Sequence, residues 1–373
     1  MKKKIFRKIL FDINNFFLIV LLSVALIIWV IQAVNFLDYV SEDGHGFYVY
    51  FSFTLLNFPR IIGSILPFIL FISIFYTFVK YENNNELLIF WTNGITKEEF
   101  AKFIVKFSLL YLIFQMLLTS VIIPKSQNMA RSFIRASTID FFPSLIKEKE
   151  FIDTVENLTI FIEKKNEDGK MFNIFLKDKL TDDRSQIIYA KEGTININED
   201  LTYMLLKNGK IINIEEEKMI SLSFEQIQFD LSNYTTKTTT WPKIQEHSTF
   251  ALLSCMVNTL SKKIILKENF YLRCTKDFYK EVVEEFLKRI YLPVFIPIIS
   301  LIACFITLKS KENYGYSKFK LLLFIIGIVI ILVSVLSLGL ANLNQWAFLS
   351  FLLIPIIIYY LTFSIFKSKA KYI

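Results

Sequence analysis

The segment Tyr81-Glu-Asn-Asn-Asn-Glu-Leu-Leu-Ile-Phe-Trp-Thr-Asn-Gly-Ile-Thr-Lys-Glu-Glu-Phe100 lies between two long apolar segments and determines how the chain is organised. Glu86 favours the first turn of a helix through its interaction with the helix dipole. Gly94 stands where a left-handed residue ends such a helix. Thr96 and Glu99 have the spacing of a capping box, which begins another helix. The pattern predicts one short helix followed by the start of a longer one.

The short helix is apolar, yet it is too short to cross a bilayer, which takes about 20 residues. Two interpretations remain open. The helix can lie in the lipid interface, as amphipathic segments commonly do. It can instead dock into a groove on a soluble partner and couple the two proteins. For the second interpretation the candidate coupling residues are Glu86, Leu87, Leu88, Phe90, Trp91 and Gly94.

The composition indicates a membrane protein, because 54% of the residues are hydrophobic and 39 of them are Phe. Basic residues precede the first apolar run, as they do in a signal peptide. That run is long enough to span the bilayer and has no small-residue cleavage site, so we expect a retained span. The six predicted spans are Phe16–Leu37, Ile61–Val79, Phe103–Ile123, Ile290–Leu308, Phe319–Leu340 and Trp346–Phe366.

The distribution of Lys and Arg predicts the orientation of these spans. If the N-terminus is cytoplasmic, every basic residue outside 125–289 except Arg60 falls on the cytoplasmic side, as the positive-inside rule requires. Both termini and the 81–100 segment are then cytoplasmic, and the long middle segment lies on the far side. Acidic and basic residues balance within 125–289, so the net charge of +8 resides in the membrane half. This distribution excludes a basic nucleic-acid-binding face.

From Leu158 the apolar pattern changes to alternation, which is typical of strands. Asn166-Glu-Asp-Gly169 and Asn208-Gly209 have the composition of hairpin turns, and Gly193 fits a bulge or corner. Short antiparallel strands at this spacing predict a sandwich or jelly-roll. After residue 248 the helical pattern returns. The expected strands are 158–164, 171–178, 186–190, 201–206, 210–214 and 220–231.

The sequence contains no motif of the common catalytic or nucleotide-binding sites: no phosphate loop, no dinucleotide fingerprint, no HExxH and no serine elbow. The predicted spans hold no central charged residue, which argues against ion-coupled transport. We therefore expect neither enzyme activity nor a cofactor or metal. Cys255 and Cys274 could pair in an oxidising compartment, although two unpaired thiols are the expectation.

Three stretches carry a resemblance to a known family. They are Asn85-Glu-Leu87 with Gly94-Ile95, the hairpin 158–178, and Glu284-Glu-Phe-Leu-Lys-Arg289 followed by Pro293 and Pro297. Together with three spans, a β domain and three more spans, they resemble the LptF/LptG permeases of lipopolysaccharide export. The Phe36–Tyr39 region slightly favours the F type. The predicted parts are 1–123 with the coupling helix at 83–94, the β-jelly-roll-like domain 124–247, the helical return 248–289, and 290–373.

The resemblance implies one half of a heterodimeric ABC-exporter membrane unit in a Gram-negative inner membrane. Its partners would be a sister permease, a cytoplasmic ATPase dimer that hydrolyses the ATP, and a single-span periplasmic bridge protein. Lipopolysaccharide would enter between the two permeases and pass onto the periplasmic β domain. The alternatives are the membrane subunit of a different ABC-type extruder, which the three-plus-three layout disfavours, or a membrane-anchored periplasmic scaffold.

An anionic lipopolysaccharide headgroup needs cations near the outer interface. Family members often carry basic residues at the outer end of the first span, where this chain has Gln32, Asn35 and Asp38. The candidates here are Arg60, Arg131 and Arg135, with Lys125, Lys288 and Arg289 as further basic residues at helix ends. The alternative is that these groups snorkel to lipid headgroups or pair with Glu284 and Glu285.

The alternating apolar residues of the β domain allow two expectations. They can line an open groove for acyl chains between two sheets, or they can fill an ordinary closed core. The residues concerned are Ile160, Ile162, Phe172, Ile174 and Leu176, with Glu163 and Lys177 expected on the outward side.

Overall fold

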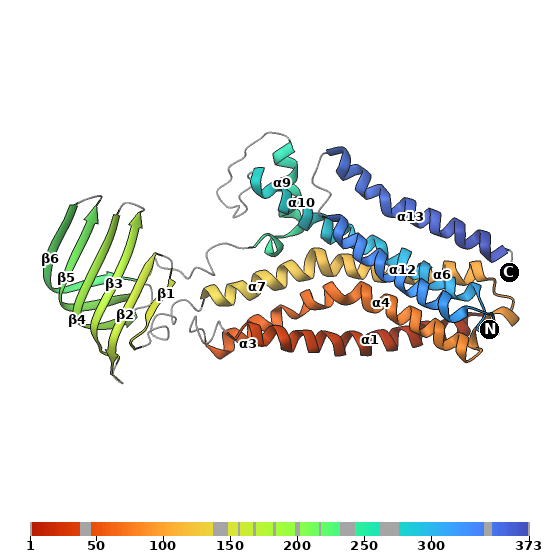
Figure 1. Ribbon diagram of the computed structural model, residues 1–373, viewed down its shortest axis with the longest axis horizontal. Coiled ribbons are helices and arrows are strands. Elements are labelled where there is room, and N and C mark those ends of the chain that lie inside the picture. Colours follow the sequence, from red (N-terminus) through yellow and green to blue (C-terminus); the bar gives the residue numbers. More distant parts are fainter. Residues whose placement is uncertain are drawn as a thin grey trace. The chain divides into compact units, whose positions relative to one another are not determined.

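The computed structural model divides into two compact units. One consists of Met1–Val30, Asn57–Asn128 and Lys243–Ile373, and the other of Ile31–Leu56 and Met129–Pro242. The first is helical and the second contains the sheet (Figure 1). The structure describes residues 2–37, 46–136, 148–155, 157–166, 169–181, 184–197, 202–215, 218–231, 243–260, 276–338 and 345–371.

Most of the described residues outside the sheet are helical (Figure 1). In the N-terminal half the helices are α1 (Lys2–Asn35), α3 (Phe47–Leu56), α4 (Phe58–Asn83), α5 (Glu86–Thr92), α6 (Lys97–Leu117), a π-helical segment (Leu118–Ile122) and α7 (Ile123–Ala136). In the C-terminal half they are α9 (Thr249–Leu260), α10 (Lys276–Ile290), α11 (Ile296–Cys304), α12 (Tyr316–Ser337) and α13 (Gln345–Lys371). Short 3-10 segments cover Ile244–Glu246, Leu292–Phe295 and Phe305–Leu308.

Six helical segments among the described residues are long and apolar enough to cross a membrane, which confirms the expected number of spans. They are longer than predicted at several ends. The first begins at Lys2 rather than near Phe16, because Lys and Arg are good helix formers and allow a helix to continue past its apolar part.

The fourth span is the centre of the helical unit. All nine residues of α11 are buried, and this helix packs against α4, α6, α12 and α13. By contrast, only 11% of the apolar window of the sixth span is buried within the chain. Large apolar side chains of α1, α12 and α13 therefore remain exposed for lipid or another protein.

Two glycines permit close helix packing. A methyl group at Gly327 on α12 would lie 2.0 Å from the ring of Phe71 on α4, and one at Gly63 would lie 2.6 Å from Ile123. The helices α4 and α12 thus approach each other where a side chain is missing.

The second unit contains a six-stranded antiparallel sheet with the strands in sequence order. The antiparallel β domain is thereby confirmed. Within the described residues its strands form one meander, without the crossed strand order of a jelly-roll. Alternation and turns predict antiparallel strands without fixing their order. The strands are β1 (Phe151–Val155), β2 (Leu158–Lys165), β3 (Met171–Thr181), β4 (Arg184–Ile197), β5 (Thr202–Glu215) and β6 (Lys218–Asp230).

Two local predictions about the sheet are wrong. Asn208-Gly209 is not a hairpin turn but lies inside β5, where Asn208 has a φ of 54° and the register stays constant on both sides. Gly193 is not at a bulge. It is buried, and a methyl group there would lie 2.4 Å from Ile174. The expected turn at 166–169 does join β2 to β3, with Gly169 at a φ of 75°.

The apolar face of the sheet is a closed core. Ile160, Ile162, Ile174 and Leu176 are at most 2% exposed, so among these residues no open acyl groove exists. Phe172 is only partly buried, because Asn173 adopts a φ of 50° and interrupts the alternation of the strand.

The cysteines differ from the expectation of free thiols. Cys255 is disulfide-bonded, whereas Cys304 on α11 is free and buried. Cys274 lies outside the described residues.

Candidate functional site

The short helix α5 is bounded by left-handed residues, as the sequence predicted for its end. Gly94 has a φ of 70°, and Asn85 before the helix has a φ of 61°. The Thr96 hydroxyl accepts a hydrogen bond from the Glu99 amide at 3.1 Å and caps α6. The Glu99 carboxylate accepts a hydrogen bond from Lys2 at 3.4 Å instead of completing the predicted capping box. The turn between α5 and α6 is therefore determined locally, while its outer side is tied to α1.

One face of α5 is anchored in the chain's own core. Leu87 and Phe90 are each 1% exposed. The Phe90 ring packs edge-on against Phe6 of α1 and Phe100 of α6, and Trp91 also contacts Phe100. Leu87 and Phe90 hold α5 to the bundle and cannot themselves contact a partner, whereas Trp91 is only partly buried.

The other face of α5 is apolar and open. Leu88 is 59% exposed and Ile89 is 49% exposed. Of the predicted coupling residues, Leu88 is therefore the apolar one best placed to contact a partner, and Ile89 was missed. Helical spacing could have found it, because residues 87 and 90 share one face and residues 88 and 89 lie beside it.

The Glu86 carboxylate is also engaged within the chain. Lys8 donates to one of its oxygens at 3.3 Å, and the Asn84 amide donates to the other at 3.1 Å. Burial opposes ionisation, but the Asn84 and Lys8 hydrogen bonds and nearby positive charges outweigh it and lower the pKa of Glu86. Glu86 therefore holds the beginning of α5 against α1.

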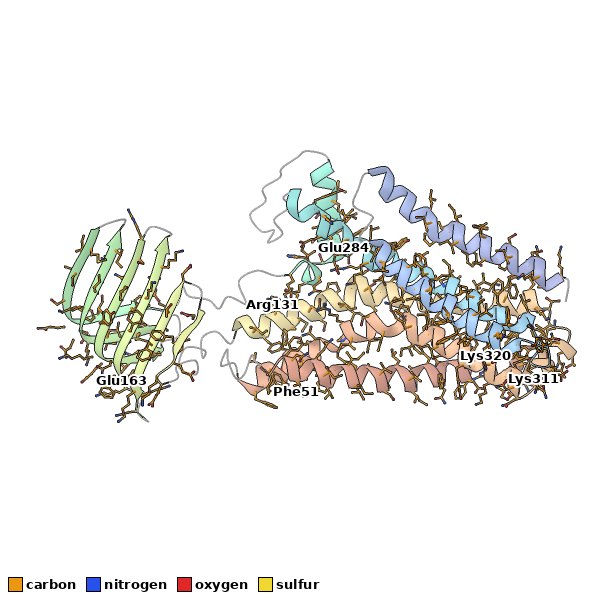
Figure 2. All side chains as sticks on the ribbon, in the orientation of Figure 1. Phe51, Arg131, Glu163, Glu284, Lys311 and Lys320 are labelled. Atoms are coloured by element: carbon orange, nitrogen blue, oxygen red, sulfur yellow. The ribbon has the colours of Figure 1, made fainter. Side chains whose placement is uncertain are left out.

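The loop before α12 makes hydrogen bonds with the end of α4, just before α5 begins. The Lys311 amide donates to the Glu82 carboxylate at 2.9 Å, and the Lys311 ammonium donates to the Asn83 carbonyl at 2.8 Å. Lys311 lies at the same end of the helical unit as the chain's N-terminus, as Figure 2, which labels Lys311, and Figure 1, which marks the N-terminus, show in the same orientation. Tyr314 in this loop is fully exposed. Contacts from α1, from α6 and from the loop before α12 thus hold α5 in place, and its other face stays exposed.

Arg289 is the centre of a second polar cluster. Its side chain is buried and donates to the Glu285 carboxylate at 3.0 Å, to the carbonyls of Gln245 and His247 at 2.9 Å, and to the Thr249 hydroxyl at 3.0 Å. Arg289 therefore pairs with Glu285, which was the structural alternative to headgroup binding.

The π-helical segment completes this cluster. The Thr119 hydroxyl donates to the Arg289 carbonyl at 2.9 Å, and the Thr249 hydroxyl donates to the Ser120 carbonyl at 2.6 Å. A π segment frees backbone carbonyls from the α-helical ladder, so they can accept such bonds. The cluster joins the third span, the beginning of the fourth and the segment that follows the β domain.

The three candidate headgroup arginines differ in environment. Arg60 is exposed near the beginning of α4. Arg131 is 9% exposed and makes interactions within the chain (Figure 2 labels it on α7). Arg135 lies one turn further along α7, and its side chain is outside the described part. Of the first-span positions, Gln32 and Asn35 belong to α1, and Asp38 lies outside the described residues.

Fold and site together define a multi-pass membrane protein that carries an antiparallel β domain between its third and fourth spans. The family model "Lipopolysaccharide export system permease LptF/LptG" matches residues 7–368, so the chain belongs to the LptF/LptG family. The family is that of the permeases of lipopolysaccharide export. The comparison does not separate the F type from the G type.

A curated relative from Rickettsia prowazekii (strain Madrid E) bears the printed name "Uncharacterized protein RP871". It is 25% identical over 222 residues, which are 59% of this chain and 61% of the relative. The matched stretch thus spans less than two thirds of either protein.

Proposed function

We propose that this protein is one permease subunit of an ABC-type exporter that extracts lipopolysaccharide from the inner membrane and passes it to a periplasmic bridge. A separate ATPase dimer supplies the energy. Membership of the LptF/LptG family supports this function. The positions of Lys and Arg support an orientation with both termini cytoplasmic and the β domain periplasmic.

The helical unit pairs with a sister permease in this proposal. The exposed apolar side chains of α1 and α12 support it, because they form an apolar surface that a second permease can cover. Lipopolysaccharide enters laterally between the two subunits.

Helix α5 contacts the ATPase through Leu88 and Ile89. The contact with the ATPase is supported by the burial pattern of α5: Leu87 and Phe90 are buried in the bundle, whereas Leu88 and Ile89 are exposed. An apolar face on a rigidly held helix fits helix-in-groove recognition. Burying a side chain such as Leu88 contributes about 1.5–3 kcal/mol, so two of them suffice to make recruitment depend on α5.

A double substitution, Leu88→Asp with Ile89→Asp, tests the role of α5. It should abolish copurification of the ATPase with the detergent-extracted permease and leave membrane insertion unchanged. The control is Tyr314→Asp, which introduces the same charge at a fully exposed position off α5. Normal copurification with the double variant would favour a helix that merely lies in the lipid interface.

The bridge protein pairs with strand β6. This strand is at one edge of the described sheet and carries the exposed apolar side chains Met219, Ile220 and Leu222. An edge strand offers unpaired backbone groups that another strand can complete. A single-span protein with an exposed β edge is the kind of partner that this surface fits.

A further inference from the structure

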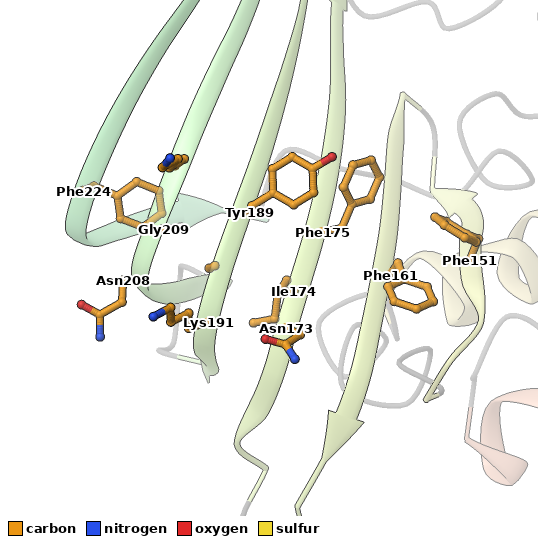
Figure 3. Close-up of a pocket in the computed structure, with 12 residues that line it drawn as sticks. Phe151, Phe161, Asn173, Ile174, Phe175, Tyr189, Lys191, Asn208, Gly209 and Phe224 are labelled. Carbon is orange, nitrogen blue, oxygen red and sulfur yellow. The ribbon is translucent and has the colours of Figure 1, made fainter.

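The face of the sheet opposite its closed core carries a row of aromatic side chains. Phe151, Phe161, Phe175 and Tyr189 lie directly opposite one another on β1 to β4. Neighbouring ring centres are 4.7 Å apart for Phe151–Phe161 and 5.2 Å apart for Phe175–Tyr189. These four residues are the aromatic ledge, and Figure 3 shows their rings side by side across the strands.

A second row on the same face is polar. Phe172 pairs with Glu192 and Ile174 with Ala190, so Asn173 lies opposite Lys191. On the next strand Ala190 pairs with Gly209 and Glu192 with Lys207, so Lys191 lies opposite Asn208. All three side chains are exposed and run parallel to the aromatic ledge (Figure 3). Asn173, Lys191 and Asn208 are the polar row.

The backbone of the polar row is strained. Asn173 near the beginning of β3 and Asn208 in the middle of β5 have φ values of 50° and 54°, where extended backbone is the rule. Non-glycine residues persist in this conformation only where their surroundings impose it, and they gather at binding and active sites. Two such residues in one row across three strands therefore indicate a binding surface.

The ledge and the polar row border one concave pocket of about 740 Å³. Its further lining includes Lys210, which pairs with Tyr189, and Phe224, whose ring lies over Gly209. The polar side chains of the lining supply two ammonium groups, two amides and a phenol. Within the described residues the lining of the pocket holds no carboxylate, and Glu163 beside the polar row accepts a hydrogen bond from Asn173. The pocket thus favours a ligand that is anionic and has both an apolar face and hydrogen-bonding groups.

We propose that this pocket binds the saccharide part of lipopolysaccharide, an inference that rests on the proposed function. A pyranose ring presents an apolar C–H face that can stack on the aromatic ledge, and hydroxyl groups that can bond the polar row. Lys191 and Lys210 select sugars that bear phosphate or carboxylate. An acyl chain fits less well. It has no hydrogen-bonding groups, so the Asn amides and Lys ammonium groups that it covers would be left without partners.

Calorimetric titration of the full-length protein in detergent tests the site. The probe is a fully deacylated lipopolysaccharide oligosaccharide that retains its phosphates. It should bind saturably, and Tyr189→Ala or Phe175→Ala should raise its Kd about tenfold. Lys191→Gln should weaken binding at low salt and less at high salt, because salt screens an exposed charge. Tyr189→Phe keeps the ring and should bind nearly normally.

The control is Lys177→Gln, which removes an exposed charge of the same sheet outside the pocket and should leave the Kd unchanged. Absence of oligosaccharide binding, or binding that Tyr189→Ala does not affect, would overturn the site. Competition by phosphatidylglycerol vesicles alone would assign the pocket to lipid chains instead. Lipopolysaccharide-stimulated ATP hydrolysis of the assembled exporter is measured separately. Its absence together with intact oligosaccharide binding would refute the proposed function and leave the site standing.

Discussion

At the scale of single residues, Arg289 and Gly209 show how one side chain, or its absence, holds a whole region. Arg289 satisfies two backbone carbonyls, a hydroxyl and a carboxylate while it is almost fully buried. Gly209 lets two strands and an aromatic ring meet where no side chain fits.

Replacing Arg289 with Gln should destabilise the helical unit by about 3 kcal/mol, because removing one member of a buried pair leaves its partners without hydrogen bonds. The measurement is the loss of folded protein on heating in detergent, followed by fluorescence. Lys288→Gln is the matched control, since it removes the neighbouring charge from an exposed position. Equal melting of the two variants would mean that Arg289 does not hold this cluster together.

Replacing Gly209 with Ala should destabilise the β domain by about 1–3 kcal/mol, the usual range for overpacking. The added methyl group would lie 2.2 Å from the Tyr189 carbonyl oxygen, and backbone cannot move aside as a side-chain end can. Protease resistance of the β domain reports the change. Gly46→Ala, at a position with open space around it, should have no such effect.

At the scale of elements, α5 and the 3-10 segment Ile244–Glu246 are both short pieces held by contacts from elsewhere. A seven-residue helix is marginal by itself, so its position depends on tertiary packing. Helix α5 is held by rings from α1 and α6, and the 3-10 segment by Arg289. Each element can therefore respond to a change in the helices that hold it.

The segment around His247 should loosen in acid. Burial lowers the pKa of His247, outweighing the opposite influence of Glu246, and the Arg289 charge lowers it further. The folded protein thus prefers the neutral imidazole. As the pH falls below about 6.5, the ordinary value, the unfolded segment takes up the proton first and stability is lost until the folded-state pKa is reached.

Hydrogen–deuterium exchange at pH 7.5 and 5.5 measures this effect over residues 244–257, after correction for the intrinsic pH dependence of exchange. Protection should be lower at pH 5.5 in the native protein. His247→Gln, which cannot titrate, should show the same protection at both values. A loss of protection in acid that persists in the variant would assign the effect to another group.

At the scale of the whole molecule, the net charge of +8 is concentrated in the membrane half, and the acidic and basic residues of 125–289 balance. The basic residues therefore serve topology first. Arg60, Arg131 and Arg135 are the candidates with a further role, as proposed contacts for the anionic headgroup. The exposed position of Arg60 supports this role, whereas Arg131 is 9% exposed and makes interactions within the chain.

Removing the charges of Arg60, Arg131 and Arg135 together, each by substitution with Gln, should lower lipopolysaccharide-stimulated ATP hydrolysis of the assembled exporter and spare its basal rate. The physical reason is the loss of charge-assisted hydrogen bonds to the headgroup. Lys106→Gln, which removes an exposed charge of α6 on the expected cytoplasmic side, is the control. If the triple variant is stimulated normally, headgroup recognition belongs to the sister permease.

The sequence by itself determined the membrane class, the number of spans and the presence of an antiparallel β domain. These follow from runs and alternation of apolar residues, which are local patterns set by bilayer thickness and strand geometry. The left-handed Gly94 and the Thr96 cap were equally predictable, because caps are local.

Only the tertiary structure decided which side of each element is free. Leu87 and Leu88 look alike in sequence, yet one is buried against distant aromatic residues and the other is exposed. The left-handed Asn173 and Asn208 lie inside strands rather than in turns, because pairing with neighbouring strands overrides their turn preference. Strand order and the partners of Arg289 likewise depend on contacts between residues far apart in the chain, and no local pattern records such contacts.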